Sequence, residues 1–212
     1  MSSILLASAS TRRRAIISEL FKDSEIGVCF CELKHDEPEP TSGVEVSTQV
    51  QEACIKKAEA ASIFSYDGIL DSPRAIIVSD TLVEDPDDYL VALGKPKDEV
   101  LAASALIRLS GKRHKVWSST TILERDGQGL VMNNGWFARS WTDFSIVEFD
   151  EINEGLMEYL ISSRSWFGKA GGYDFAGEAG RISKIIQGEE VTVLGFSGRA
   201  ISELSTKILK RM

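Results

Sequence analysis

The chain has 212 residues, and its hydrophobic fraction of 43% is enough to build the core of one large globular domain. The formal net charge of −8 argues against a protein that follows the backbone of a nucleic-acid polymer, but a local basic pocket for a small phosphorylated ligand remains compatible with it. No apolar run is long enough for a secretory signal or a membrane span, and the cysteine count of 3 is odd, so we expect a cytoplasmic protein with reduced thiols and no membrane partner.

A strand, a small-residue turn and a helix are predicted at residues 4–21. Residues 4–7 form a short apolar run, and residues 8–10 supply small side chains and hydroxyls where a helix must begin. Three arginines follow at residues 12–14, although cations at a helix N-terminus oppose the helix dipole. Because a helix N-terminus also presents unpaired N–H groups, and guanidinium groups bind phosphate, we predict a polyanion site here. The alternative is that the arginines are solvated residues of the first turn.

The next segments are a strand over residues 26–33, a polar loop and a long helix. The loop at residues 34–43 holds two prolines and several carboxylates, and taken alone it reads as a solvated linker. Residues 46–63 have few helix breakers and place small apolar side chains near one helical face. Lys57 lies near that face, and its simplest interpretation is a lysine that extends its ammonium group to solvent.

The strongest strand signal covers residues 74–83, and its apolar interior predicts a buried strand. The polar triplet at residues 79–81 interrupts this run. A buried carboxylate is costly unless it is paired or bound to a metal ion, so Asp80 is the leading functional candidate. The alternative is a structural aspartate that caps a loop.

A glycine before a lysine at residues 94–96 lets the backbone approach a ligand while the ammonium group of Lys95 reaches it. The segment lacks the spaced glycines and the following Ser or Thr of a P-loop. Asp98 is then predicted to cap a helix that runs to Leu109 and ends at Gly111.

The second half of the chain is predicted to be rich in strands. Strands are expected over residues 114–123 and onward to residue 149, followed by a helix capped by Asp150. The glycine-rich segment at residues 168–177 is either a loop that closes over a ligand or a connection anchored by its tyrosine. A final strand is predicted at residues 191–196, before a helix capped by Ser197.

Several short motifs, in one order along the chain, together resemble the Maf family of nucleoside triphosphate pyrophosphatases, also described as septum formation inhibitor Maf-like proteins. Each motif is weak alone, but the set is specific. The motifs are residues 6–14, the acidic pair Asp36 and Glu37, residues 57–58, residues 79–81, residues 94–96, residues 109–111 with His114 and Val116, and residues 170–173.

The resemblance implies an α/β fold of the inosine-triphosphatase-like type, with an elongated mixed sheet, flanking helices and two lobes around a cleft, in a single domain over residues 1–212. It implies hydrolysis of a nucleoside triphosphate between the α and β phosphates, a divalent metal cation (Mg²⁺ or Mn²⁺), a link to septum formation and a homodimer. The favoured substrates of the family are dTTP, UTP and modified nucleotides in one branch and 7-methyl-GTP in another.

The resemblance also implies the roles of single residues. Asp80 is expected to orient or activate the attacking water and to share the metal with Glu37. The residues expected to bind substrate are Ser8, Arg12, Arg13, Lys57, Thr81 and Lys95.

The sequence departs from the family pattern at two positions that bear on this expectation. Thr11 stands where proline is usual, which is a mild change near a helix start. Ala176 stands where members that act on dTTP and UTP carry glutamine, and its side chain cannot hydrogen-bond a base edge. Two alternatives therefore remain at this stage: a pyrophosphatase with another base preference, such as 7-methyl-GTP, or a nucleotide-binding regulator of cell division without catalytic activity.

Overall fold

The fold is built on a mixed sheet of eight strands, seen in a computed structural model that describes residues 3–33, 39–64 and 73–208. β1 runs parallel to both of its neighbours, and the other pairs are antiparallel. This confirms the predicted mixed sheet. Its main path runs in the order β2 (Gly27–Cys31), β1 (Ser3–Ala7), β3 (Ala75–Asp85), β5 (Arg113–Glu124), β7 (Phe137–Phe149) and β6 (Leu130–Val131), while β4 (Asp88–Leu93) pairs with β3 and β8 (Ser183–Gln187) with β7.

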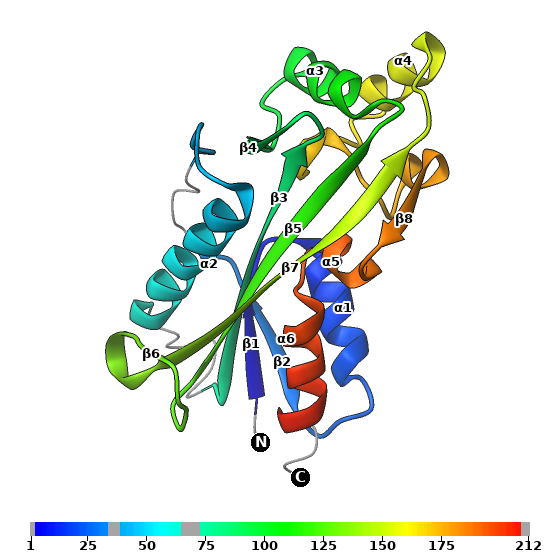
Figure 1. The fold of residues 1–212 in the computed structure, drawn as a ribbon. Coiled ribbons are helices and arrows are strands. Elements are labelled where there is room, and N and C mark those ends of the chain that lie inside the picture. Colours follow the sequence, from blue (N-terminus) through cyan, green and yellow to red (C-terminus); the bar gives the residue numbers. More distant parts are fainter. Residues whose placement is uncertain (1–2, 34–38, 65–72, 209–212) are drawn as a thin grey trace.

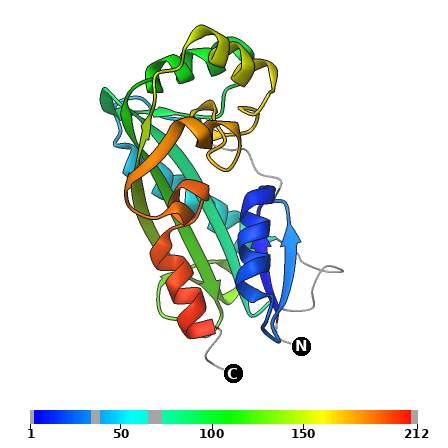
Figure 2. The ribbon, with the colours of Figure 1, turned by 90° about the vertical axis from the view of Figure 1, so that its right-hand side faces the viewer.

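Helices cover both faces of the lower half of the sheet (Figures 1 and 2). Helix α2 (Val46–Ile63) packs on one face, and α1 (Thr11–Phe21) and α6 (Gly198–Glu203) pack on the other. Strand side chains alternate between faces, so Leu5 of β1 joins the cluster under α2 while Ile4 and Leu6 join the cluster under α1. The apolar run at the start of the chain is therefore buried on both sides.

A second core lies in the upper half of the molecule (Figure 1). Strands β3, β5 and β7 run from the lower half into this upper lobe, where α3 (Glu99–Leu109) and α4 (Glu154–Ser162) cover them. Leu106 and Leu109 of α3 pack with Val116 of β5, Phe149 of β7 and Leu160 of α4. The two lobes thus share their long strands, as the expected two-lobed architecture requires.

Asp98 and Ser197 cap helices as predicted, and Ser10, one of the hydroxyl residues expected at the first helix start, caps α1. The hydroxyl of Ser10 accepts a hydrogen bond from the backbone of Arg13 (3.4 Å), and the carboxylate of Asp98 accepts one from Leu101 (2.8 Å). Ser197 caps α6 in the same way, accepting from the backbone of Ala200 (3.2 Å). Each cap satisfies one of the N–H groups that a helix start leaves without a partner.

The predictions for the last quarter of the chain were partly wrong. Residues 191–196 are not a strand, because Glu190–Leu194 forms the short helix α5. A short apolar run does not distinguish the two states, and here Glu190 favours the first helical turn while Gly195 ends the helix with a positive φ of 117°. One strand was not predicted, β8 at residues 183–187. The cap of α4 is Asn153 instead of Asp150, because the side chain of Asn153 accepts from the backbone N–H of Leu156 at 2.9 Å.

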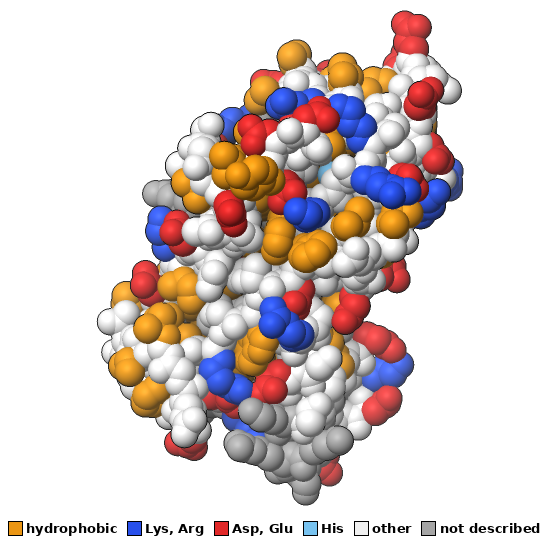
Figure 3. All heavy atoms as spheres, viewed as in Figure 1, with side chains coloured by type: hydrophobic (Ala, Val, Ile, Leu, Met, Phe, Trp, Pro, Cys, Tyr) orange, Lys and Arg blue, Asp and Glu red, His pale blue; other side chains and the backbone are white. Residues whose placement is uncertain are grey.

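Lys and Arg side chains are interspersed with Asp and Glu on the face shown in Figure 3. Within residues 3–33, 39–64 and 73–208, no helix combines the length and the apolar character needed to cross a bilayer.

Candidate functional site

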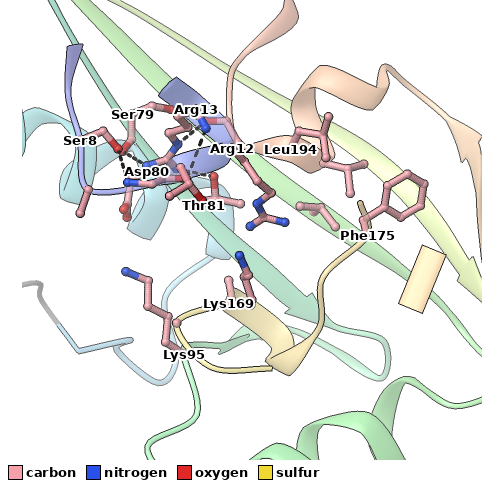
Figure 4. Close-up of a pocket in the computed structure, with 18 of the residues that line it drawn as sticks. Ser8, Arg12, Arg13, Ser79, Asp80, Thr81, Lys95, Lys169, Phe175 and Leu194 are labelled. Atoms are coloured by element: carbon pink, nitrogen blue, oxygen red, sulfur yellow. Dashed lines mark hydrogen bonds between the residues drawn. The ribbon is translucent and has the colours of Figure 1, made fainter. Parts of the chain in front are cut away.

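A cleft of about 760 Å³ is lined by residues of both lobes (Figure 4). Ser8 and Asp80 lie at one end and Phe175 and Leu194 at the other, with Arg12 between them. Of the residues predicted to form a site, the cleft lining includes Ser8, Arg12, Arg13, Lys57, Asp80, Thr81 and Lys95. Glu37, the expected metal ligand, lies outside the described residues. The structure therefore brings together every predicted site residue that it describes.

Lys57 and Asp80 form a salt bridge between α2 and β3 at the floor of the cleft. Small side chains such as Ala58 and Ala61 let α2 approach the sheet closely, and this packing turns Lys57 toward β3. Lys57 is only 7% exposed, so the interpretation that it extends to solvent was wrong. Asp80 lies within β3 and does not cap a loop.

Arg13 connects three parts of the cleft wall. Its guanidinium group donates to the carbonyl oxygens of Gly195 and Ser79 and to the hydroxyl of Thr81, each at 2.8 Å. Thr81 also shares a hydrogen bond with Ser118 (2.9 Å). The geometry therefore gives Arg13 a part in holding the backbone on either side of Asp80.

The other two arginines at the start of α1 point in different directions. Arg12 donates from Nη1 to the carboxylate of Asp174, in the segment of residues 168–177, at 2.9 Å. Arg14 donates to the carbonyl oxygen of Ser8 (3.0 Å), and its guanidinium carbon lies 5.7 Å from the centre of the Phe30 ring. Arg14 is absent from the residues that line the cleft. The triplet is thus neither a uniform solvated face nor a single anion site.

The cleft also contains residues that the sequence alone did not assign to it. Lys169, Phe167 and Phe175 come from the glycine-rich segment at residues 168–177 and the turn before it. Lys169 pairs with the far carboxylate oxygen of Asp174 (3.3 Å). A ligand loop was one of the two interpretations of this segment, but nothing in the sequence linked it to Arg12.

Tyr173 anchors this segment to the sheet, which agrees with the second of the two predicted interpretations. Its hydroxyl hydrogen-bonds His114 Nε2 of β5 at 2.9 Å, and both side chains are buried. Burial raises the pKa of the Tyr173 phenol well above its usual value, an effect that the nearby charge of Arg12 partly offsets. Burial also lowers the pKa of His114 to about 3, so the imidazole is neutral at pH 7.

Position 176, where the family pattern has glutamine, lies outside the cleft lining. Ala176 is exposed, and its backbone N–H donates to the carboxylate of Asp174 at 3.2 Å. The apolar end of the cleft is instead formed by side chains such as Phe175, Val193 and Leu194.

The described lining holds two carboxylates, Glu32 and Asp80, whose oxygen atoms are the donor type that Mg²⁺ and Mn²⁺ prefer. Within the described residues, no group of three or more metal-ligating side chains is present. Carboxylate oxygens that line a cleft are the donors such a metal ion would take, so the residues present are compatible with the expected cofactor.

Comparison with known proteins identifies the family. A model of Maf-like proteins matches residues 3–208. The dTTP/UTP pyrophosphatase of Pyrococcus furiosus is 32% identical over 196 residues, which span 92% of this chain and 90% of that relative. The dTTP/UTP pyrophosphatase of Agathobacter rectalis is 33% identical over 209 residues, or 92% of each chain. Among solved structures, a HAM1 protein from Coxiella burnetii aligns over 100% of both chains with a TM-score of 0.46 and 18% identity. The chain belongs to the Maf family of nucleoside triphosphate pyrophosphatases, which its motifs resemble.

Proposed function

We propose that this cleft hydrolyses a nucleoside triphosphate between its α and β phosphates, releasing a nucleoside monophosphate and pyrophosphate. The observation that carries the proposal is the Lys57–Asp80 pair at the floor of a cleft rich in cations. Hydrolysis of a phosphoanhydride needs positive charge around the phosphate oxygens and a group that orients water, and this cleft offers both.

Phosphate binding is assigned to the cationic middle of the cleft. In a chain of net charge −8, the described lining holds five cationic side chains and two acidic ones. Arg12, Lys95 and Lys169 approach the space from two sides, and Ser8 adds a hydroxyl at the end near Asp80. Such a local excess of positive charge attracts a polyanion although the protein as a whole is acidic.

Asp80 is assigned the role of activating the water molecule that attacks the phosphate. Its carboxylate accepts a hydrogen bond from the attacking water and takes its proton, as a general base does. The salt bridge to Lys57 fixes the position of the carboxylate, and Arg13 holds the backbone of Ser79 beside it. We further assign Lys57 to the phosphate chain, because its ammonium group lines the same space as Asp80.

A divalent cation completes this assignment, with Asp80 and Glu37 as the residues that would hold it. When bound, Mg²⁺ or Mn²⁺ neutralises charge on the phosphate oxygens. Metal removal by a chelator is therefore expected to abolish turnover, and added Mg²⁺ is expected to restore it.

The base is assigned to the apolar end of the cleft, beside Phe175 and Leu194. An aromatic ring and aliphatic side chains favour stacking and apolar contact with any base. We propose dTTP and UTP as the preferred substrates because two relatives above 30% identity carry the name dTTP/UTP pyrophosphatase. Ala176, exposed and outside the lining, is not expected to read the base.

The test is a panel of dTTP, UTP, CTP, GTP, 7-methyl-GTP and ITP with Mg²⁺ or Mn²⁺, in which pyrophosphate and orthophosphate are measured separately. We expect pyrophosphate and monophosphate in equal amounts, fastest from dTTP and UTP. Fastest turnover of 7-methyl-GTP would overturn the base assignment and leave the reaction intact. Tight binding of nucleotide with no product from any substrate would replace the enzyme with the nucleotide-binding regulator.

A further inference from the structure

The carboxylate of Asp174 pairs with a cation from each of the two lobes that line the cleft. Oδ1 accepts from Arg12 Nη1 at 2.9 Å, and Oδ2 lies 3.3 Å from Lys169 Nζ. Arg12 belongs to α1 of the lower lobe, while Lys169 and Asp174 belong to the glycine-rich segment that packs on the upper lobe. One acid thus joins two cations of the cleft lining.

The side chain of Asp174 is itself held in place. Its Oδ1 accepts from the backbone N–H of Ala176 (3.2 Å), which fixes the carboxylate relative to its own turn. The preceding residue, Tyr173, is buried and bonded to His114. The acid therefore stands on a rigid support instead of a loose loop tip.

The segment around Asp174 is also fixed from its other end. The backbone N–H of Gly171 donates to the carbonyl oxygen of Gly94 at 3.0 Å, next to Lys95. Gly171 has a φ of 68°, and a Cβ atom there would lie 2.8 Å from a side-chain carbon of Val83. This close approach needs glycine. This hydrogen bond fixes the backbone next to Lys95 against the segment that carries Lys169.

Asp174 does not line the cleft, whereas Arg12 and Lys169 do. The carboxylate therefore contacts two cations of the lining without itself lining the ligand space. We propose that Asp174 is a positioning residue that orients Arg12 and Lys169 toward the phosphate chain of the substrate. The proposal rests on the proposed function, because it assigns these cations to a polyphosphate.

Two opposite effects of Asp174 are conceivable, and the geometry decides between them. A carboxylate near the cleft repels a polyanion, but this one is paired at close range with two cations, so little of its charge acts at a distance. Arginine and lysine side chains lose much rotational freedom when they are ordered. An anchored carboxylate imposes that order before the ligand binds, so positioning is the larger effect.

The test measures binding of inorganic tripolyphosphate by calorimetry and turnover of dTTP, for wild type and for Asp174→Asn and Asp174→Ala. Asp174→Asn keeps an oxygen that accepts from the backbone N–H of Ala176, but it places a neutral amide group beside Lys169. This variant therefore preserves the turn and remains usable if Asp174→Ala fails to fold. We expect the tripolyphosphate Kd and the dTTP KM to rise about tenfold, with kcat within about threefold of wild type, because Arg12 and Lys169 act on binding.

Glu178→Ala is the matched control. It raises the net charge by the same amount and removes a carboxylate of the same segment that pairs with the exposed side chain of Arg181. Its Kd for tripolyphosphate is expected to equal that of wild type. In an Arg12→Ala, Lys169→Ala background, adding Asp174→Asn is expected to change the Kd less than twofold, since its targets are gone.

An Asp174→Asn protein that binds tripolyphosphate as tightly as the control, or more tightly, would overturn the proposal. A tenfold rise in the tripolyphosphate Kd when Asp174→Asn is added to the Arg12→Ala, Lys169→Ala background would overturn it as well. If wild type binds tripolyphosphate in an Asp174-dependent way but releases no pyrophosphate from any nucleotide, the proposed function fails and the role of Asp174 stands.

Discussion

Lys57 of α2 and Asp80 of β3, which lie 23 positions apart in the sequence, form a salt bridge that is largely shielded from solvent. The side chains are 9% and 15% exposed. Each of these charges stabilises the other, because either one alone would be an unpaired charge in a poorly solvated site. The pair therefore links the stability of the α2–β3 contact to the chemistry proposed for the cleft.

Replacing Lys57 by Met is expected to cost both stability and activity. The variant leaves the Asp80 charge uncompensated, so the free energy of unfolding is expected to fall by about 3 kcal/mol. Turnover is expected to fall by about 100-fold, because the carboxylate is no longer held in position. Urea unfolding and pyrophosphate release measure the two effects.

Two further variants separate stability from activity at this pair. Lys56→Met removes the same charge from an exposed position of the same helix and is expected to change neither quantity. Adding Asp80→Asn to Lys57→Met removes the uncompensated charge and is expected to restore stability without activity. Wild-type stability in Lys57→Met alone would show that the pair contributes nothing to folding.

Gly195→Ala is expected to destabilise the cleft wall. Gly195 has a φ of 117°, and a Cβ atom there would lie 2.8 Å from Arg13 Nε, the atom that donates to the carbonyl oxygen of Gly195. Strain from the positive φ and displacement of the guanidinium group add up to about 2 kcal/mol of lost stability. Thermal or urea unfolding measures it.

The control for this substitution is Gly168→Ala. Gly168 also has a positive φ, of 70°, but a Cβ atom there meets no atom within 4 Å. Its cost is expected to be backbone strain alone, about 1 kcal/mol. Equal losses for the two substitutions would mean that the contact with Arg13 adds nothing.

His114 is expected to make stability depend on pH. The pKa of this buried imidazole is about 3, below its ordinary value of 6.5, so the native state keeps it neutral while the unfolded chain takes up a proton. The contribution is present above about pH 6.5 and is lost as the pH falls from there toward 3. Wild type is expected to lose about 1.4 kcal/mol between about pH 7.5 and 5.5 through this group.

His114→Gln is the variant that isolates this effect. Glutamine can still hydrogen-bond Tyr173 but does not titrate, so its urea-unfolding stability is expected to fall less than that of wild type over the same interval. Other groups contribute equally to both proteins and cancel in the difference. Parallel pH dependences would mean that His114 takes up its proton equally in the native and unfolded states, which would contradict the lowered pKa.

Local sequence signals predicted much of the scaffold. The start of α1 at Ser10, helix α2 and strand β3 around Asp80 were each predicted from residues that are neighbours in the sequence. The strand predicted at residues 191–196 was wrong because an apolar run of that length fits a helix turn as well as a strand. The position of Gly195, which ends the helix with a positive φ, and packing against β5 and β7 favour the helix here.

The connections within the cleft could not be predicted in the same way. Arg13 finds an acceptor in Gly195, 182 positions away, and Arg12 finds Asp174, 162 positions away. The helix pattern alone left Lys57 as a lysine that extends to solvent, because periodicity does not show how closely a helix packs on a sheet, whereas the family resemblance assigned Lys57 to the substrate. The family resemblance selected seven of the residues that line the cleft, and the structure shows which partners hold residues such as Arg13 and Lys57.

The measurement that tests the central claim most directly is pyrophosphate release from saturating dTTP by wild type and Asp80→Asn, with Asp87→Asn as an exposed control. Unfolding curves check that each protein is folded, and tripolyphosphate binding checks that its cleft still binds a polyphosphate. We expect Asp80→Asn to lose about 1,000-fold in kcat while the control keeps the wild-type rate, because asparagine cannot take the proton of the attacking water. An Asp80→Asn protein that retains a tenth or more of the wild-type kcat would contradict the assignment of Asp80.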